Sequence, residues 1–185
     1  MSKVFITLIH YPVYDKNKNI VTTSITNFDL HDISRTAKTY GIEKYILIHP
    51  MESQHFFAQR IIDHWCKGYG SVYNKNRKEA LSLIKMLYSF EECIEYIEKN
   101  YQKKVITVAT SARKFSNTIT YKKLKEELQN NDLNYLLVFG TGWGLHDEIV
   151  NRCTYILEPI KGPTDYNHLS VRAAVAIILD RLLGQ

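Results

Sequence analysis

The chain has 185 residues, of which 45% are hydrophobic, and it carries a formal net charge of +5 at pH 7. That length suits one domain that can bury a sizeable core. No apolar run approaches the roughly 20 residues that a membrane-spanning helix needs, and the first residues lack the small-residue cleavage site of a secretory signal. We therefore expect a single domain over residues 1–185 that works in the cytoplasm.

The charged side chains indicate which kind of partner the protein could bind, and the cysteines bear on disulfides and metal sites. A net positive charge is compatible with a polyanionic partner such as a nucleic acid, although clustered lysines also keep ordinary helix surfaces solvated. The basic residues gather in three local clusters: Lys67, Lys75, Arg77 and Lys78; Lys99, Lys103 and Lys104; and Arg113, Lys114, Lys122, Lys123 and Lys125. The three cysteines lie far apart, which indicates buried free thiols, with no disulfide framework and no metal site.

Strand-like and helix-like segments alternate along the chain. In chain order we expect a strand at 4–9, a helix at 28–40 that ends at Gly41, a strand at 45–49, a helix at 52–66, a loop at 67–76, a helix at 77–99 with a break near Ser89, a strand at 105–109, a helix at 121–129, strands at 135–139 and 155–157, and a helix at 169–183. The last helix is almost entirely apolar, so it should be buried on more than one face. This alternation predicts an α/β fold, with a mostly parallel sheet and helices on both faces.

Residues 135–144 combine the pattern of a buried strand with a glycine-rich loop. The apolar run 135–139 leads directly into Gly140, Gly142 and Gly144, and residues 145–150 are typical of a short helix with acids in its first turn. Glycine lets the backbone turn tightly and approach a ligand closely. Because open α/β sheets bind ligands at the carboxyl ends of their strands, this stretch predicts a small-molecule site, although such a loop can also serve a tight turn alone.

A second stretch, residues 157–179, places a constrained loop before the last helix. The loop contains Pro159, Gly162 and Pro163, and four polar side chains then crowd the start of the helix, namely Asp165, Asn167, His168 and Ser170. Asp165 or Asn167 could cap the helix. Capping by one residue does not account for the whole group, so we interpret the group as part of a site.

Three stretches of the chain, in the same order, resemble the SPOUT superfamily of methyltransferases. Residues 29–42 are similar to the first motif of the ribose-methylating branch, Asn-x-Gly-x-x-x-Arg-Thr-Ala, and Arg35 falls on the motif's arginine. Residues 138–148 match the strand that enters the glycine loop, and residues 157–179 match a Pro-Ile-x-Gly loop with the helix after it. The chain has Asp29, His31 and Leu169 where that branch has Asn, Gly and Asn. It looks more similar to a small single-domain subgroup likened to the catalytic domain of tRNA guanine ring-nitrogen methyltransferases.

The resemblance implies a fold, a cofactor, partners and a set of site residues. It implies a C-terminal trefoil knot, S-adenosylmethionine as cofactor, RNA (tRNA or rRNA) as substrate, and a homodimer, because the family's substrate pockets include both subunits. The residues implied to bind the cofactor are Phe139, Gly140, Thr141, Gly144, Leu157, Pro159, Ile160, Gly162, His168, Leu169 and Ser170. Those implied to act in catalysis, in one pocket with the cofactor, are Arg35, Asp165, Asn167 and Ser170.

The residue types fit methyl transfer, in which an enzyme mainly holds two reactants in line. The acceptor must lose a proton, and Asp165 or His168 is the candidate base. A guanidinium hardly deprotonates, so Arg35 would clamp a phosphate or orient the nucleophile; otherwise it is an ordinary surface arginine. Two other classes stay open, an RNA-binding module that keeps the fold without catalysis and a nucleotide-binding α/β enzyme. The choice between base and ribose as target also stays open.

Overall fold

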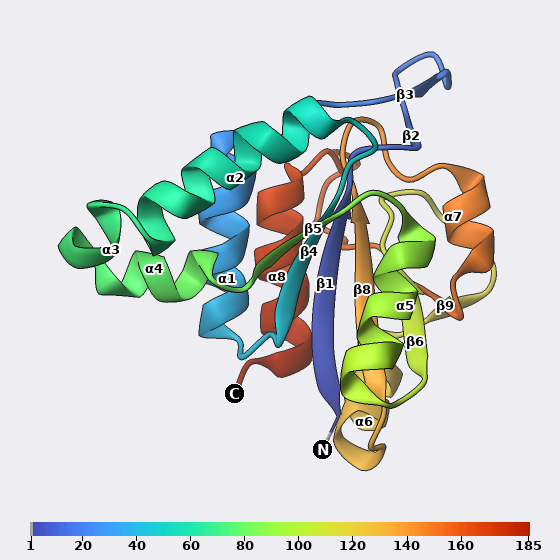
Figure 1. Ribbon diagram of the computed structural model, residues 1–185. Coiled ribbons are helices and arrows are strands. Elements are labelled where there is room, and N and C mark those ends of the chain that lie inside the picture. Colours follow the sequence, from blue (N-terminus) through green and yellow to red (C-terminus); the bar gives the residue numbers. More distant parts are fainter. Residues whose placement is uncertain (1) are drawn as a thin grey trace.

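The centre of the molecule is a seven-stranded sheet in which every pair of neighbouring strands is parallel (Figure 1). In this computed structural model, which describes residues 2–185, the strands lie in the order β5-β4-β1-β8-β6-β9-β7. They are β1 (Lys3–Ile9), β4 (Lys44–Ile48), β5 (Ile84–Leu87), β6 (Val105–Ala109), β7 (Thr118–Ile119), β8 (Asn134–Gly140) and β9 (Tyr155–Leu157). A short antiparallel hairpin of β2 (Val13–Tyr14) and β3 (Ile20–Val21) follows β1.

Helices cover both faces of this sheet, which confirms the predicted α/β class (Figure 1). One face packs against η1 (Asp29–Ile33), a π-helical turn that continues directly into α1 (Ser34–Thr39), and against α2 (Glu52–Cys66), α6 (Tyr121–Asn130) and α8 (Val171–Leu183). The other face packs against α5 (Phe90–Tyr101) and α7 (Asp147–Arg152). The far end of α2 extends away from the sheet with α3 (Gly70–Tyr73), and α4 (Lys75–Leu81) returns to pack on α1.

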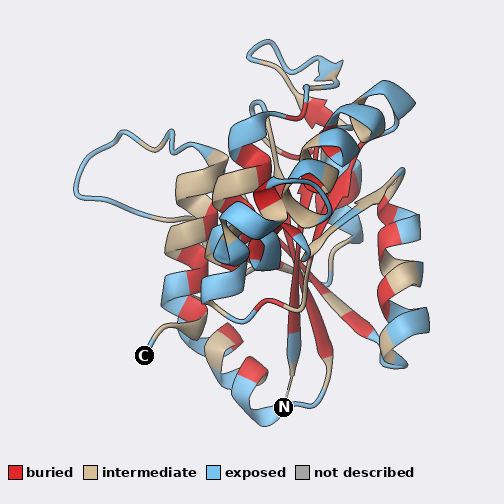
Figure 2. Ribbon diagram, turned by 60° about the vertical axis from the view of Figure 1, so that its left-hand side comes forward, coloured by how far each residue is buried: buried red, intermediate tan, exposed pale blue. Residues whose placement is uncertain are grey.

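Side chains of the two central strands alternate between the two helical layers. In β8, Tyr135, Leu137 and Phe139 join the core beneath α8, while Leu136 and Val138 join the core beneath α5 and α7. Strands buried on both faces read as continuous apolar runs, which is why β1 and β8 were recognisable in the sequence. Figure 2 shows these strands buried in the middle and the helices buried along their inward faces.

The segment 77–99 is not the single helix that its apolar spacing predicted. It divides into α4, the edge strand β5 and α5, which is itself capped by the side chain of Ser89. Backbone pairing outweighs helical periodicity here: the amide of Tyr45 donates to the carbonyl of Leu83, and the amide of His49 donates to that of Leu87. The break expected near Ser89 is therefore confirmed, and the loop expected at 67–76 instead contains α3 and the start of α4.

The last helix differs from its prediction at its start and on its outer face. Its N-cap is Ser170, whose side chain accepts from the amide of Ala173, so neither Asp165 nor Asn167 caps it. Its inward face, Val175, Ile178, Leu179 and Leu182, is buried, whereas its other apolar side chains are only half-buried. No helix among residues 2–185 is long and apolar enough to cross a membrane.

The cysteines are free, as expected, but only one of them is fully buried. Burial raises the pKa of the Cys93 thiol to about 12, so this side chain behaves as a core residue. Cys66 and Cys153 are partly exposed, so the expectation of buried thiols is wrong for these two.

Candidate active site

A cavity of about 910 Å³ opens at the edge of the sheet where β6, β8 and β9 end. Its apolar wall includes Phe139, Leu157 and Ile178, all of which are buried. Around this wall lie the glycine loop 140–144, the loop 158–170, and the segments that follow β3 and β6. An apolar wall with a polar rim at the carboxyl ends of parallel strands is the usual setting of a ligand site in such folds.

Most residues predicted to bind a cofactor line this cavity. They are Phe139, Gly140, Thr141, Gly144, Leu157, Ile160, His168, Leu169 and Ser170. Pro159 and Gly162 are not among the lining residues, and Gly162 lies on the exposed part of its loop. Of the residues predicted for catalysis, Asp165, Asn167 and Ser170 also line the cavity. The two separate stretches thus meet where the sequence placed them.

The glycine loop owes its shape to packing against the rest of the protein. A side chain at Gly140 would place its Cβ 2.8 Å from the backbone nitrogen of Leu145, so the missing side chain makes room for the loop itself and not for a ligand. Gly142 has a φ of +58°, and a Cβ there would lie 2.7 Å from the carbonyl oxygen of Tyr14. The loop is held against the β2–β3 hairpin because the amide of Trp143 donates to that same carbonyl over 2.8 Å.

A half-buried chain of polar side chains connects the glycine loop to a histidine at the end of β1. The hydroxyl of Thr23 contacts the hydroxyl of Thr141 and lies 3.0 Å from Nδ1 of His10. Burial, and next the neighbouring His49, lower the pKa of His10 to about 4. His10 is therefore neutral near pH 7 and fixes Thr23 at the wall of the cavity without adding charge.

The loop 158–170 presents its polar side chains with few competing partners. Asp165 is exposed, and no ion pair or hydrogen bond engages its carboxylate within residues 2–185. Asn167 donates from Nδ2 to the carbonyl of Ala112 over 3.4 Å, which ties this loop to the segment after β6. The ring of His168 lies edge-on between Trp143 and Tyr166, at centroid distances of 5.7 and 5.5 Å. Asp165 is thus a carboxylate at the cavity that no other described residue engages.

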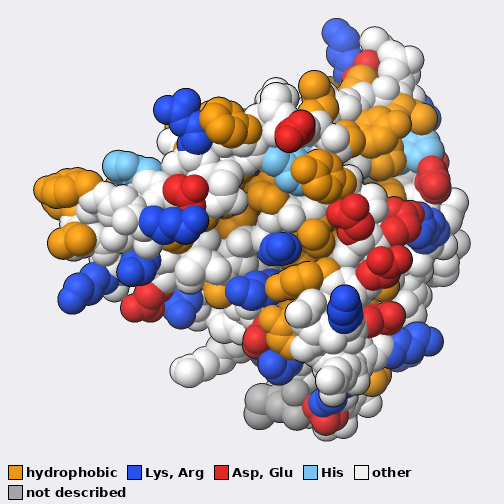
Figure 3. Space-filling model, viewed as in Figure 1, with side chains coloured by type: hydrophobic (Ala, Val, Ile, Leu, Met, Phe, Trp, Pro, Cys, Tyr) orange, Lys and Arg blue, Asp and Glu red, His pale blue; other side chains and the backbone are white. Residues whose placement is uncertain are grey.

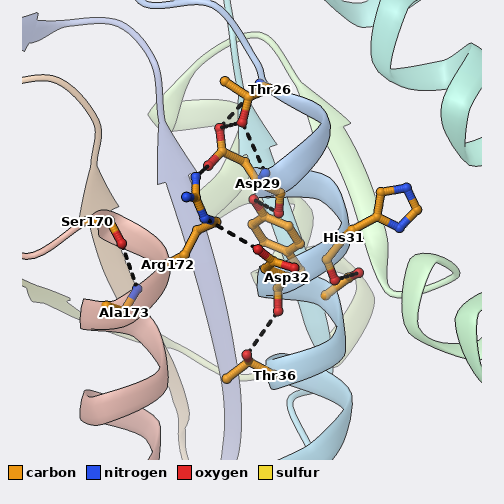
Figure 4. A network of polar contacts seen from close by, with 10 residues as sticks. Thr26, Asp29, His31, Asp32, Thr36, Ser170, Arg172 and Ala173 are labelled. Atoms are coloured by element: carbon orange, nitrogen blue, oxygen red, sulfur yellow. Dashed lines mark hydrogen bonds and ion pairs between the residues drawn. The ribbon is translucent and has the colours of Figure 1, made fainter.

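A network that sequence reasoning did not identify joins η1 to the start of α8 (Figure 4). The guanidinium of Arg172 lies 3.7 Å from Oδ1 of Asp29 and 3.4 Å from Oδ2 of Asp32. Asp29 is buried at the cavity and accepts a 2.6 Å hydrogen bond from the hydroxyl of Thr26. Burial raises the pKa of Tyr45 well above its usual value, and the negative charge of Asp29 raises it further. The network holds η1 and α8 together beside the cavity.

Arg35 does not lie in this cavity, contrary to the prediction that it shares a pocket with Asp165. It is exposed and lines a second hollow, between α1 and α2. The reason is helical geometry: Arg35 lies six residues after Asp29 along η1 and α1, which is not a whole number of helical turns, so the two side chains point to different sides. Asp29 faces the cavity, and Arg35 faces away from it.

Two further lining segments, 23–29 and 110–113, were absent from the prediction. Thr110 and Ser111 directly follow the strand expected at 105–109, so the rule that strand ends share one edge could have found them. Thr23 and Thr26 follow a two-residue strand that leaves no periodic signal. Arg113 closes the rim by an ion pair of 2.8 Å with Asp147 at the start of α7, and this pair lowers the pKa of Asp147.

Comparison with known families identifies the family to which this chain belongs. Residues 3–184 match the model of a family described as SAM-dependent RNA methyltransferase. The match includes both loops of the cavity and almost the whole chain. The chain belongs to this family. It is therefore a methyltransferase whose methyl donor is S-adenosylmethionine, as the sequence predicted.

Individual relatives agree with the family. An uncharacterized protein of Aquifex aeolicus is 46% identical over 98% of this chain and 89% of its own length. A tRNA (guanine-N(1)-)-methyltransferase of Nitratidesulfovibrio vulgaris is 42% identical over 98% of this chain, which spans only 42% of that relative. The SpoU methyltransferase AviRb from Streptomyces viridochromogenes, solved with AdoMet, has the same fold, with a TM-score of 0.59 at 15% identity, covering 98% of this chain and 57% of AviRb. The predicted membership in a family of S-adenosylmethionine-dependent RNA methyltransferases is confirmed, and AviRb shows the same fold.

The cavity has the character that S-adenosylmethionine requires. Its volume of about 910 Å³ lies in the usual range for sites of small molecules and cofactors. Phe139, Leu157 and Ile160 would cover the faces of an adenine ring, and Thr141 and the backbone of the two loops would meet its polar groups. Within residues 2–185, no group of three or more His, Cys, Asp or Glu side chains could hold a metal ion.

Proposed function

We propose that this chain methylates a nucleotide of a structured RNA, a tRNA or an rRNA, at the cavity formed by the glycine loop and the loop 158–170. The observation that carries the proposal is the meeting of an apolar wall, two close backbone loops and an unpartnered carboxylate, Asp165, in one cavity. The family match favours neither an inactive module nor an unrelated nucleotide enzyme. The name of the Nitratidesulfovibrio relative makes guanine in tRNA the first target to assay.

The residues of this chain divide the chemical work between them. The cofactor supplies a methyl group on a positively charged sulfonium, which can move in line to a nucleophile. Asp165 takes the proton that the acceptor loses, and His168, edge-on to Trp143, is the alternative base. Asn167 fixes the loop that carries both through its bond to Ala112. Ser170 contributes through the cap of α8, which sets the position of this loop.

Positive surface charge supports RNA as the substrate. Exposed Lys114 lies in the segment that follows β6, and exposed Lys122 and Lys123 lie in the first turn of α6. Further Lys and Arg side chains gather where α2, α3 and α4 extend from the sheet, beside exposed hydrophobic side chains (Figure 3). Lysines and arginines near phosphates release counterions on binding, so affinity would fall steeply with salt. Such a substrate implies the cytoplasm as the compartment.

The same proposal includes a homodimer, a trefoil knot and a single catalytic domain over the chain. The half-buried apolar side chains of α8, Ala173, Ala176 and Ile177, support a second copy against this helix. A dimer would also allow Arg35, which points away from its own cavity, to serve RNA bound across two subunits. The knot is supported by the path of the chain, which leaves β8 in mid-sheet, reaches β9 beyond β6 and returns beside the glycine loop to α8. Light scattering would measure the dimer.

A methyl-transfer assay with a matched acid control tests the proposed activity. Purified protein, labelled S-adenosylmethionine and unfractionated tRNA or rRNA should yield labelled RNA, and digestion to nucleosides with mass spectrometry would identify the product. Asp165→Asn should lower the rate by about 100-fold or more, a usual cost of losing an acid–base group. Glu95→Gln, which neutralises an exposed acid on α5 across the sheet, should leave the rate unchanged. Binding of the cofactor without labelling of any RNA would instead identify an inactive RNA-binding module.

A further inference from the structure

A second hollow of about 650 Å³ lies between η1 and α1 on one side and α2 and α4 on the other. Three arginines from three different helices line it: Arg35 from α1, Arg60 from α2 and Arg77 from α4. We call it the arginine hollow. Phe28, His31 and Trp65 line it as well. It is separate from the cofactor cavity, and η1 forms the partition, because Asp29 lines one space and Asp32 lines the other.

The positive charge in the arginine hollow is not neutralised by the protein. Among residues 2–185, no carboxylate forms an ion pair with Arg35, Arg60 or Arg77. Asp32, the one acid that lines the hollow, is already engaged by Arg172 at 3.4 Å. A protein gains nothing in stability by converging three unpaired cations, so this arrangement indicates an anionic ligand.

Two buried nitrogens in the hollow also lack partners. Nε of Arg77 and Nδ1 of His31 are buried, and no atom of the described chain accepts or donates a hydrogen bond there. Both side chains are fixed by Trp65: the guanidinium of Arg77 lies 4.5 Å from its ring centroid, and the ring of His31 meets it edge-on at 5.6 Å. Leaving buried polar groups unsatisfied costs free energy unless a ligand completes them.

Aromatic side chains frame the hollow as well. Phe28 is 64% exposed and Phe57 is 41% exposed, although both are large apolar residues. The guanidinium of Arg172 lies 5.3 Å from the centroid of the Phe28 ring, so this ring is held at the junction between the hollow and the cofactor cavity. An exposed ring beside a group of arginines is the usual arrangement for stacking a base next to a bound phosphate.

We propose that the arginine hollow binds the phosphodiester backbone of the RNA substrate and that Phe28 stacks on a base of the same strand. The inference rests on the proposed RNA methyltransferase function and adds where the RNA strand lies on the protein. Arg60 and Arg77 bind phosphate oxygens through their guanidinium groups. The RNA strand then passes over η1, so that the nucleotide next to the stacked base reaches the cofactor cavity beside Asp29.

Equilibrium binding of unfractionated tRNA, measured by fluorescence anisotropy over a series of salt concentrations, tests this assignment. Arg60→Gln combined with Arg77→Gln should weaken binding at least tenfold and reduce the slope of log K against log salt by about 1.4 to 1.8, because each phosphate contact contributes about 0.7 to 0.9. Arg60→Gln alone removes an exposed side chain without disturbing Trp65, so it controls for folding and should reduce the slope by about half as much. Phe28→Leu should weaken binding about fivefold or more with the slope unchanged.

The matched control removes two cations elsewhere. Lys99→Gln with Lys104→Gln changes an exposed residue of α5 and an exposed residue of the turn between α5 and β6, neither of which lines the arginine hollow, and should leave affinity and slope as in the wild type. All variants should bind S-adenosylmethionine normally by calorimetry, because the hollow is separate from the cavity.

Each contrary result has its own meaning. If the Arg60/Arg77 variant binds and methylates RNA as the wild type does, the arginine hollow is not the RNA-binding site, and the proposed function still stands. A wild type that binds no RNA would overturn both. Binding of a nucleoside monophosphate at the hollow as tightly as tRNA, lost in the same variant, would make it a small-molecule site. A change of oligomeric state in light scattering, without a change in RNA affinity, would make it a protein interface.

Discussion

Acid should destabilise this protein through His10, and the structure gives the size of the effect. His10 is fully buried at the end of β1, with Nδ1 bonded to Thr23 and with Nε2 lacking a partner among the described residues. Its pKa is about 4 in the folded protein, against 6.5 in an unfolded chain. Between these pH values the unfolded chain binds the proton and the folded chain does not, so folding loses stability as the pH falls.

The magnitude follows from the two pKa values. Each pKa unit corresponds to about 1.4 kcal/mol, so the stability that is fully present above about pH 7 should fall by about 3 kcal/mol as the pH approaches 4. This is a large fraction of the 5–15 kcal/mol that is typical of a folded domain. Because Thr23 also contacts Thr141 in the glycine loop, the cofactor cavity should loosen over the same pH range.

Urea unfolding at a series of pH values, followed by circular dichroism, measures the effect. His10→Asn keeps a donor near Thr23 but cannot be protonated, so its free energy of unfolding should lose about 3 kcal/mol less than that of the wild type between about pH 7.5 and about pH 4. His64→Asn is the control, because His64 is exposed on α2 and should behave as the wild type. Burial also lowers the pKa of His49, so part of the acid effect should persist in all three proteins. If His10→Asn lost stability as steeply as the wild type, the assignment of the acid effect to His10 would be refuted.

Four further substitutions probe the site. Ser170→Ala removes the cap of α8 and should lower the free energy of unfolding by about 1 kcal/mol in urea, whereas Asp165→Ala should leave the melting temperature unchanged and slow methyl transfer about 100-fold. Early melting with normal methylation in Asp165→Ala would contradict its catalytic role. Arg172→Gln leaves the buried carboxylate of Asp29 without a cation and should cost about 1–3 kcal/mol in the same urea experiment, and an unchanged midpoint would show that the network does not stabilise η1. Gly140→Ala forces a side chain against Leu145 and should cost about 1–3 kcal/mol and weaken S-adenosylmethionine binding in calorimetry, while unchanged values would mean that the loop adjusts freely.

The parts of the fold that local patterns specify were predictable from the sequence. Strands β1 and β8 are buried on both faces and carry long apolar runs, and Gly140 and Leu157 both stand where a strand ends. Parallel strands end at one edge of the sheet, and the family resemblance implied that the glycine loop and the loop 158–170 meet there in one pocket. The class of fold and most of the cavity therefore followed from the sequence.

The parts that depend on distant packing were not predictable. Residues 84–87 have helical spacing, yet they form β5 because the edge of β4 offers unpaired backbone groups. The hairpin that supports the glycine loop consists of two-residue strands, which are too short to show periodicity. The position of Arg35 depends on the face of η1 and α1 that turns toward the sheet, and the motif that identified this residue says nothing of that face.

The network around Arg172 gives a physical reason for one departure from the ribose-methylating motif. Asp29 stands where that branch has Asn, and here its carboxylate faces a guanidinium that it shares with Asp32. An amide at this buried position would leave Arg172 with a single carboxylate, and the hydroxyl and amide of Thr26, which now bond to Oδ2 of Asp29, would lose their charged acceptor. The acid is therefore matched to an arginine at the start of α8. Because Asp29 borders the cofactor cavity and Asp32 borders the arginine hollow, the same guanidinium that neutralises both acids also fixes the two spaces relative to each other.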